Sequence, residues 1–104
     1  MVDVVSRIKR AVLEAAEECG VGVVRVVLFG SRARGDAGEG SDWDVLVVVD
    51  RGLSREEKLR FWYSIYRRLD VPVDIVIVDE GTLRRYGRYH GFIYRYALEE
   101  GVTL

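Results

Sequence analysis

Three short runs of β-branched residues limit the fold of this chain more than any other feature. They lie at residues 23–29, 42–49 and 73–78, and each is bounded by Gly, Ser, Asp or Pro. Valine and isoleucine favour extended strands. In the first run only Arg25 is polar, which indicates a strand inside a sheet. The apolar stretches are far shorter than the roughly 20 residues that cross a bilayer, so the sequence predicts a small sheet and no membrane span.

An amphipathic helix is predicted at residues 2–19, ahead of the first strand. Its apolar side chains recur at steps of three and four residues, as on one face of a helix. They are Val5, Ile8, Val12, Ala15 or Ala16, and Cys19. Gly20 suits the left-handed position that follows a helix. The sequence therefore predicts a helix that ends at residue 19 and packs one face on the sheet.

A second helix is predicted to begin at Ser54, between the second and third strands. Glu57 lies three residues later, which is the spacing of a capping box. The apolar residues that follow predict a stripe buried in the core. They are Leu59, Trp62, Tyr63, Tyr66 and Leu69. Short helices are expected at residues 82–86 and 91–100, and residues 101–104 form either a final strand or a tail.

This order of elements predicts an α/β (α+β) fold, with a small mixed β-sheet and helices packed mainly on one face. The 104 residues suffice for one modest core, so residues 1–104 are expected to form a single domain. The formal net charge of −1 and the pI near 5.8 argue against a nucleic-acid-binding polycation.

Cysteine usage and the N-terminus predict a cytoplasmic protein. Cys19 is the single cysteine, so no internal disulfide can form. Charged residues interrupt residues 1–10, unlike the apolar centre of a signal peptide. The chain also lacks Asn and Gln and is rich in Arg, which indicates either a thermophilic source or a GC-rich genome.

Two carboxylates stand at the start of the second strand. Side chains alternate along a strand, so Asp42 and Asp44 point to the same face, roughly 6–7 Å apart at Cα. Trp43 and Val45 are expected to point the other way, into the core. Two ionised carboxylates at this spacing repel each other unless a cation lies between them. Mg²⁺ takes such oxygen ligands together with substrate phosphates.

Asp74 is the third candidate acid. It is the only polar residue within residues 73–78, and burying an unpartnered carboxylate there would be costly. If its strand lies beside that of Asp44, the two acids could share one pair of metal ions. Asp74 could then act as a general base or position an attacking hydroxyl.

The turn after the first strand has the features of a phosphate-binding loop. Gly30 lets the backbone approach a phosphate, and Ser31 adds a hydroxyl donor at what is expected to be a short helix. Arg32 and Arg34 could neutralise charge, although one of them could instead pair with Asp36 or Glu39. Each feature alone also has a structural explanation, such as a turn, a cap or a satisfied core acid, but their combination is much rarer.

The combination resembles the polymerase-β-type nucleotidyltransferase superfamily, and more narrowly the minimal nucleotidyltransferases (MNT domain proteins). Their pattern of Gly-Ser-x-Ala-Arg-Gly, a short gap and Ser-Asp-x-Asp is matched at eight positions. These are Gly30, Ser31, Ala33, Arg34, Gly35, Ser41, Asp42 and Asp44. The leading helix, the later acid and a Glu-Gly near the C-terminus also fit, so the resemblance covers nearly the whole chain.

The resemblance implies a polymerase-β-like fold and a metal-dependent enzyme. Asp42, Asp44 and Asp74 would be the catalytic acids and would bind two divalent ions, usually Mg²⁺. Gly30 and Ser31 would hold the β- and γ-phosphates of ATP, with Arg34 beside them. A hydroxyl would attack the α-phosphorus and release pyrophosphate, with two metals stabilising the attacking and leaving oxygens.

The resemblance also implies a partner. Minimal members pair with an all-helical HEPN protein in toxin–antitoxin systems, and here the antitoxin would transfer AMP to a Tyr of the toxin. Two alternatives stay open: a binding antitoxin without catalysis, and transfer to a small molecule. The sequence does not decide between a monomer, a homodimer and a hetero-oligomer.

The C-terminal third interleaves tyrosines with arginines. They are Tyr86, Tyr89, Tyr94 and Tyr96 with Arg84, Arg85, Arg88 and Arg95. Such a pattern suits a protein interface, helix packing with solvated Arg heads, or single-stranded nucleic acid, although the net charge argues against the last. Arg84 or Arg85 with His90 matches the spacing of HEPN nucleases, but that fold is all-helical, and His90 is expected to be a surface or partner-facing residue.

Overall fold

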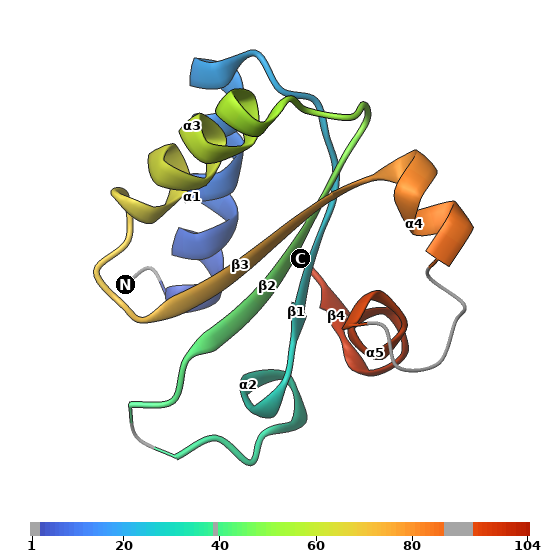
Figure 1. Ribbon diagram of the computed structural model, residues 1–104. Coiled ribbons are helices and arrows are strands. Elements are labelled where there is room, and N and C mark those ends of the chain that lie inside the picture. Colours follow the sequence, from blue (N-terminus) through green and yellow to red (C-terminus); the bar gives the residue numbers. More distant parts are fainter. Residues whose placement is uncertain (1–2, 39, 87–92) are drawn as a thin grey trace.

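The computed structural model describes residues 3–38, 40–86 and 93–104. Figure 1 shows helices and strands in nearly the predicted order. The elements are α1 (Val4–Cys19), β1 (Val23–Phe29), α2 (Ser31–Arg34), β2 (Trp43–Val49), α3 (Arg55–Tyr66), β3 (Val73–Asp79), α4 (Glu80–Tyr86), α5 (Ile93–Glu100) and β4 (Val102–Thr103). None of the helices within these described residues is long and apolar enough to span a bilayer.

The four strands form one mixed sheet in the order β3-β2-β1-β4. β1 runs antiparallel to β2 and to β4, whereas β2 and β3 are parallel. The short β4 settles the choice that the sequence left open at residues 101–104, since Val102 and Thr103 pair with β1. The predicted mixed sheet is confirmed.

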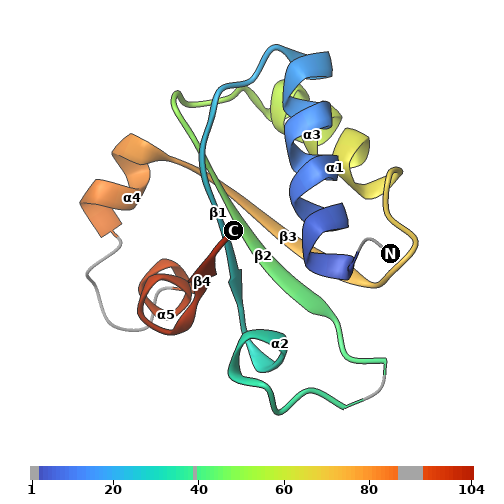
Figure 2. The same cartoon turned by 180° about the vertical axis from the view of Figure 1, so that it is seen from behind.

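Helices α1 and α3 lie side by side on one face of the sheet, while α4 and α5 lie on the other, as the two opposite views show (Figures 1 and 2). The larger core lies beneath α1 and α3. Its sheet residues are Val26, Leu28, Val45, Val47, Val49, Val73, Ile75 and Ile77. A smaller apolar cluster that includes Ala97 of α5 covers the opposite face. The two long helices and most of the core therefore share one face, as predicted.

Local sequence signals explain both ends of α1. The Asp3 carboxylate accepts a hydrogen bond from the Ser6 backbone N–H at 2.7 Å, which caps the first turn. Gly20 follows the helix with φ of 67°, in the left-handed region that glycine adopts readily. The buried face carries Ile8 and Val12, as predicted.

The start of α3 was predicted correctly, but its buried face was not. Ser54 and Glu57 form the expected capping box. The stripe that the sequence placed in the core is mostly exposed: Leu59 is 56%, Trp62 38%, Tyr63 63% and Tyr66 43% exposed, and only Leu69 packs against the core. The side chains of α3 that enter the core are instead those of Phe61 and Ile65.

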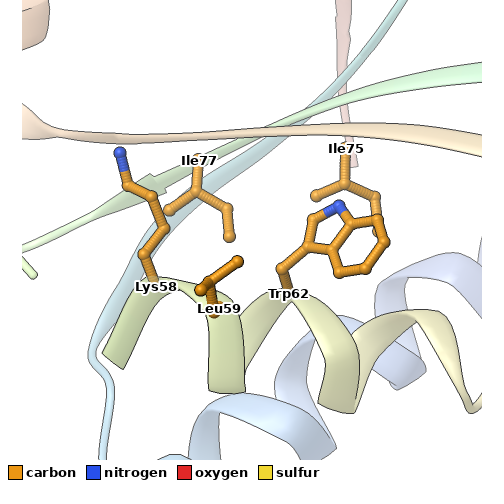
Figure 3. Close-up of a pocket in the computed structure, with 5 residues that line it drawn as sticks. All are labelled: Lys58, Leu59, Trp62, Ile75 and Ile77. Carbon is orange, nitrogen blue, oxygen red and sulfur yellow. The ribbon is translucent and has the colours of Figure 1, made fainter. Parts of the chain in front are cut away.

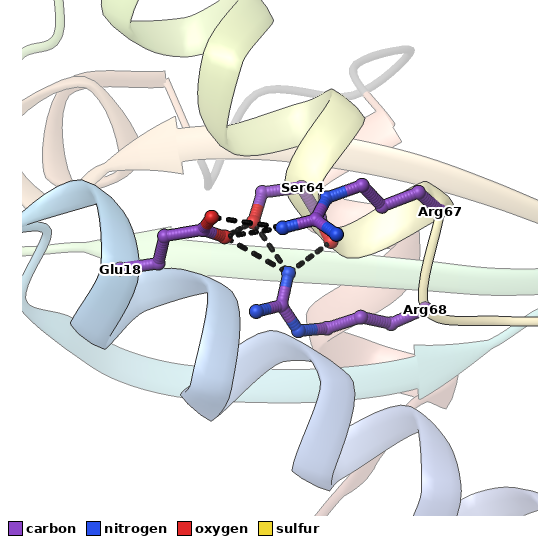
Figure 4. A network of polar contacts seen from close by, with 4 residues as sticks. All are labelled: Glu18, Ser64, Arg67 and Arg68. Atoms are coloured by element: carbon purple, nitrogen blue, oxygen red, sulfur yellow. Dashed lines mark hydrogen bonds and ion pairs between the residues drawn. The ribbon is translucent and has the colours of Figure 1, made fainter.

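A polar network between α1 and α3 explains why Phe61 and Ile65, and not the predicted stripe, face the core (Figure 4). The Glu18 carboxylate of α1 accepts hydrogen bonds from the Ser64 hydroxyl and from Arg67 and Arg68, the latter two at 2.8 and 3.0 Å. Ser64 is only 3% exposed, so its polar side must face α1. With Ser64 held there, Trp62 and the tyrosines turn away from α1.

This network predicts an acid-sensitive contribution to stability. Hydrogen bonds from Ser64, Arg68 and Arg67 lower the pKa of Glu18 to about 2. A carboxylate whose pKa is lower in the folded protein than its ordinary 4.5 stabilises the fold at higher pH and loses that contribution as the pH falls toward 2. We expect Glu18→Gln to flatten the dependence of Tm on pH between about 5 and 2, measured by circular dichroism.

Glu57 supplies a matched comparison for this prediction. Hydrogen bonds from Arg51 and Ser54 lower its pKa to about 2 as well. The Glu57→Gln variant should therefore remove a separate part of the same pH dependence, and the double variant should remove both parts. A Glu18→Gln variant with an unaltered Tm profile would show that the network contributes nothing to folding.

Candidate active site

The parallel pairing of β2 with β3 brings two of the predicted acids together. Asp44 stands opposite Asp74 in the register of the two strands. Neighbouring strands lie about 4.8 Å apart, so the backbones of these two residues are adjacent. The expectation that their strands are neighbours is confirmed. Because Val45 and Ile75 face the core beneath α1 and α3, both acids start from the opposite face of the sheet.

Asp42 lies just ahead of β2, and its side chain is exposed. Asp44 is half-buried, whereas Asp74 is exposed. The sequence indicated that a carboxylate inside this apolar run would be costly to bury. Asp74 avoids that cost because it is exposed. It is the second residue of β3 and stands where this end of the sheet opens to solvent.

The electrostatics at Asp44 are unfavourable for a charged carboxylate. Burial raises its pKa, and the negative charges of Asp74 and Asp42 raise it further, while Arg34 partly offsets them. Within the described residues, none of the three acids makes a side-chain hydrogen bond or an ion pair. The acceptor oxygens of all three carboxylates are therefore not engaged by other described side chains.

Free, mutually repelling carboxylates suit hard divalent cations such as Mg²⁺. The side chains are not already gathered for this purpose, however. Among the residues that the structure describes, no group of three His, Cys, Asp or Glu side chains could hold a metal ion as placed. The types of the donor atoms and their local charge fit a cation, and the roles of Asp42, Asp44 and Asp74 as metal ligands stay a prediction.

The glycine turn lies directly against one of these acids. Phe29 is paired with Asp44 across β1 and β2, which brings Gly30 over the Asp44 carboxylate. A Cβ atom on Gly30 would overlap one oxygen of the Asp44 carboxylate, Oδ2. Gly30 also has φ of 75°, where side chains are strained. The sequence indicated a glycine for phosphate approach but gave no sign of this contact, which depends on strand register.

Ser31 begins α2 immediately after Gly30, and its side chain is partly exposed. The backbone of the turn is closed by hydrogen bonds from the Ala33 and Arg34 N–H groups to the Gly30 carbonyl, both at 3.1 Å. Gly30, Ser31 and Asp44 therefore lie together at one end of the sheet. Figure 1 shows α2 at this end, below β1 and β2.

Arg34 connects this turn to the C-terminal helix. Its guanidinium donates to Asp36 at 3.1 Å and to the Tyr96 hydroxyl, and its Nη1 lies 3.5 Å from Glu100. The Tyr96 ring meets Phe29 edge-on, with 6.1 Å between the ring centres. Tyr96 thus contacts the residue before the turn and the last residue of α2.

The sequence left open whether Arg32 or Arg34 pairs with Asp36 or Glu39. Arg34 makes the predicted ion pair with Asp36, while Glu39 lies outside the described residues. Arg32 donates to the Ser41 carbonyl at 2.9 Å and lies 4.5 Å over the Trp43 ring. Arg32 therefore braces the loop that leads into β2.

Part of the Tyr- and Arg-rich segment is not described, including Arg88, Tyr89 and His90. The expectation for His90 accordingly lies outside the described residues. Arg85 of α4 lies 6.0 Å from the ring centre of Tyr86. Tyr96 of this segment contacts the residues on both sides of the glycine turn, Arg34 through its hydroxyl and Phe29 through its ring.

The chain is similar to several known proteins. The chain is 45% identical over 53 residues to "Putative protein adenylyltransferase MJ0141" of Methanocaldococcus jannaschii; the match covers 51% of this chain and 52% of that protein, about half of its length. A solved structure described as "Structure of putative minimal nucleotidyltransferase" is 33% identical, with a TM-score of 0.60 over 92% of this chain and 88% of the other.

A third similarity is one of fold alone. A structure described as "Crystal structure of the toxin-antitoxin with AMP-PNP" superposes with a TM-score of 0.62 at 19% identity, over 91% of this chain and 70% of that chain. The sheet and helices are therefore those of the polymerase-β-like nucleotidyltransferase fold. The sequence profile described as "Nucleotidyltransferase domain" matches residues 5–102. With nearly its whole length matched, the chain belongs to the nucleotidyltransferase domain family.

Proposed function

We propose that this nucleotidyltransferase transfers AMP from ATP to a hydroxyl group, and that the acceptor is a Tyr of a HEPN-family toxin. The chain would then act as the antitoxin of a toxin–antitoxin pair in the cytoplasm. The observation that carries the proposal is the pairing of Asp44 with Asp74 beside the Gly30 turn. Two acids and a close backbone approach are what a transfer site for a triphosphate requires.

The proposed metal ligands are Asp42, Asp44 and Asp74, which would hold two Mg²⁺ ions. Bound ions of this kind neutralise the triphosphate and stabilise the attacking and leaving oxygens. The support for this assignment is the charge at the site: Asp74 and Asp42 raise the pKa of Asp44, so a cation would relieve their repulsion.

The remaining roles fall to the turn and to Asp74. Gly30 and Ser31 would bind the β- and γ-phosphates, and Arg34 would add positive charge. The acceptor oxygen would form a bond to the α-phosphorus, the bond from that phosphorus to the bridging oxygen of the β-phosphate would break, and pyrophosphate would leave. The Asp74 carboxylate, which is exposed, would orient the acceptor hydroxyl and take its proton.

The choice of AMP and of a toxin rests on resemblance. One relative is named as a protein adenylyltransferase, and one structure of the same fold is a toxin–antitoxin described with AMP-PNP. The HEPN family and the Tyr acceptor come from the pattern shared with minimal nucleotidyltransferases.

Label transfer tests the proposal directly. The purified chain would be incubated with Mg²⁺ and a candidate HEPN-family toxin, using ATP labelled either at the α- or at the γ-phosphate. We expect the α-label to enter the toxin and the γ-label to leave as pyrophosphate. Label from the γ-position in the toxin would instead indicate a kinase, and a toxin without any label would contradict AMP transfer.

A binding antitoxin without catalysis is the second candidate. The observation in its favour is that the described acids are not gathered into a ready metal site. Growth rescue separates the two functions. A catalytically disabled Asp42→Asn, Asp74→Asn double variant should fail to neutralise the toxin if transfer is the mechanism, and should rescue growth fully if binding suffices.

Tyr96 gives a prediction about how the turn is held. Tyr96→Phe keeps the ring against Phe29 but removes the hydroxyl that accepts from Arg34. Because that hydroxyl holds the guanidinium beside the turn, its loss should weaken the binding of the triphosphate more than the chemical step. We therefore expect the KM for ATP to rise several-fold, with kcat much less affected. Steady-state kinetics at varied ATP would measure this.

The Tyr94→Phe variant serves as a control on the same helix, since Tyr94 packs against the smaller apolar cluster. It should leave the KM for ATP unchanged. Equal KM values for wild type and Tyr96→Phe would show that Arg34 does not act on the triphosphate through this contact.

A further inference from the structure

The outer edge of β3 is open within the described part of the chain. Among residues 3–38, 40–86 and 93–104, β3 stands at the end of the sheet and pairs only with β2. Trp43 N–H donates to the Pro72 carbonyl at 2.9 Å. In a parallel ladder the direction of the backbone groups alternates residue by residue, so the N–H and C=O groups of Ile75 and Ile77 point outward. An edge of this kind readily pairs with another strand.

An apolar groove runs along this edge (Figure 3). It has a volume of about 260 Å³ and is lined by Lys58, Leu59, Trp62, Ile75 and Ile77. The figure shows Leu59 and Trp62 of α3 reaching toward the two isoleucines of β3. Leu59 and Trp62 belong to the stripe that the sequence placed in the core, and they are 56% and 38% exposed.

The apolar surface extends along α3 beyond the groove. Trp62 stacks on Tyr66, with 4.9 Å between the ring centres, and Tyr66 is 43% exposed. An open strand edge beside a row of exposed aromatic and aliphatic side chains is a surface suited to association.

We propose that the occupant of this surface is a second copy of the same chain. The two β3 strands would pair antiparallel about a two-fold axis at Val76, which joins the two sheets into one. In this register Ile75 of each copy faces Ile77 of the other, and both residues turn their backbone groups toward the partner strand. Such an interface uses the same patch on both copies and closes as a dimer.

Charge and register favour a second copy as the occupant. The register about Val76 uses all seven residues of β3 and sets Asp74 of one copy against Val78 of the other, so no two acids meet across the strands. In each copy Lys58 lies beside Ile77 and Trp62 beside Ile75 (Figure 3). Two-fold pairing therefore brings the Lys58 ammonium toward the Trp62 ring of the other copy, where a cation–π contact is favourable.

The dimer does not depend on the proposed transfer reaction. Ile75 and Ile77 face the core beneath α1 and α3, whereas Asp74 starts from the opposite face of the strand. The groove therefore lies on the face of β3 that does not carry Asp74, and the oligomeric state can be measured without any transfer reaction.

Sedimentation velocity of the full chain tests the inference. We expect a species of about twice the 11.9 kDa of one chain at micromolar concentration. Leu59→Glu places a charge at a groove position that is 56% exposed, so the fold should survive, and the dimer should dissociate at least tenfold more readily. Tyr63→Glu is the matched control, because Tyr63 is 63% exposed on α3 and does not line the groove; it should stay dimeric.

Hydrogen exchange tests the strand pairing itself. The outward amides of Ile75 and Ile77 should be protected at high protein concentration and should exchange faster in the Leu59→Glu variant. A chain that is monomeric at all concentrations overturns the inference. So does a dimer that Leu59→Glu does not weaken, and so does a toxin that covers this groove while the chain alone is monomeric.

Discussion

Asp44→Asn is expected to abolish AMP transfer and at the same time to make the folded protein more stable. Loss of one proposed metal ligand from a site that would neutralise a triphosphate should remove several kcal/mol of transition-state stabilisation, which corresponds to a fall in kcat of about 1000-fold or more. Asn keeps the shape of the side chain but cannot carry the negative charge. Transfer of the α-label to the toxin measures the first effect.

The gain in stability follows from the pKa of Asp44. Burial and the charges of Asp74 and Asp42 raise it in the folded protein. A raised pKa means that the folded state binds the proton more tightly than the unfolded chain, so ionised Asp44 destabilises the fold at neutral pH. The Asp44→Asn variant should melt at a higher temperature than the wild type at pH 7. The difference should shrink as the pH falls from neutral toward the ordinary carboxyl pKa of 3.8, and it should be absent below that pH.

Asp50→Asn is the matched control for this experiment. Asp50 directly follows β2, at the opposite end of the same strand from Asp44, and it is exposed. Its variant should transfer AMP at the wild-type rate. Undiminished transfer by Asp44→Asn would show that this carboxylate has no part in the reaction. A lower melting temperature for Asp44→Asn would show that other groups in the fold already compensate the repulsion between Asp44 and Asp74.

The parts of the fold that the sequence predicted correctly are those with local signals. The strand at Val23–Phe29 was predicted with its observed bounds, because the run of β-branched residues ends at a glycine. The capping box at Ser54 needs only two residues three positions apart. The sequence suggested a shared site for Asp44 and Asp74 if their strands were neighbours. The parallel pairing of β2 with β3 makes them neighbours.

The parts that were missed depend on contacts between distant residues. The apolar spacing in α3 fits a helix, but two faces of that helix carry large apolar side chains. Which face is buried is decided by Ser64 and Arg68, through their hydrogen bonds to Glu18, 46 and 50 residues away. In the same way, the contact of Gly30 with Asp44 arises only when β1 and β2 pair.

The second large effect is expected from Gly30→Ala, which should damage folding and transfer together. At φ of 75° an alanine is strained, at a cost of about 1–3 kcal/mol. Its Cβ atom would also displace the Asp44 carboxylate that lies against the turn. A shift of about 1 Å in a reacting group can lower the rate roughly 100-fold, so kcat/KM for ATP should fall at least that far.

Gly20→Ala separates the two causes. Gly20 has a similar φ of 67°, but a Cβ atom there would meet nothing within 4 Å, and the residue only ends α1. The Gly20→Ala variant should be destabilised by a comparable strain energy, seen as a lower Tm, while kcat/KM stays at the wild-type value. If both glycine variants transfer AMP normally at a temperature where they are folded, then the close approach of Gly30 to Asp44 does not shape the site. If only Gly30→Ala is impaired in transfer, the Asp44 carboxylate and the Gly30 turn act together in the site. Backbone strain is common to both variants, whereas the overlap with Asp44 occurs only in Gly30→Ala.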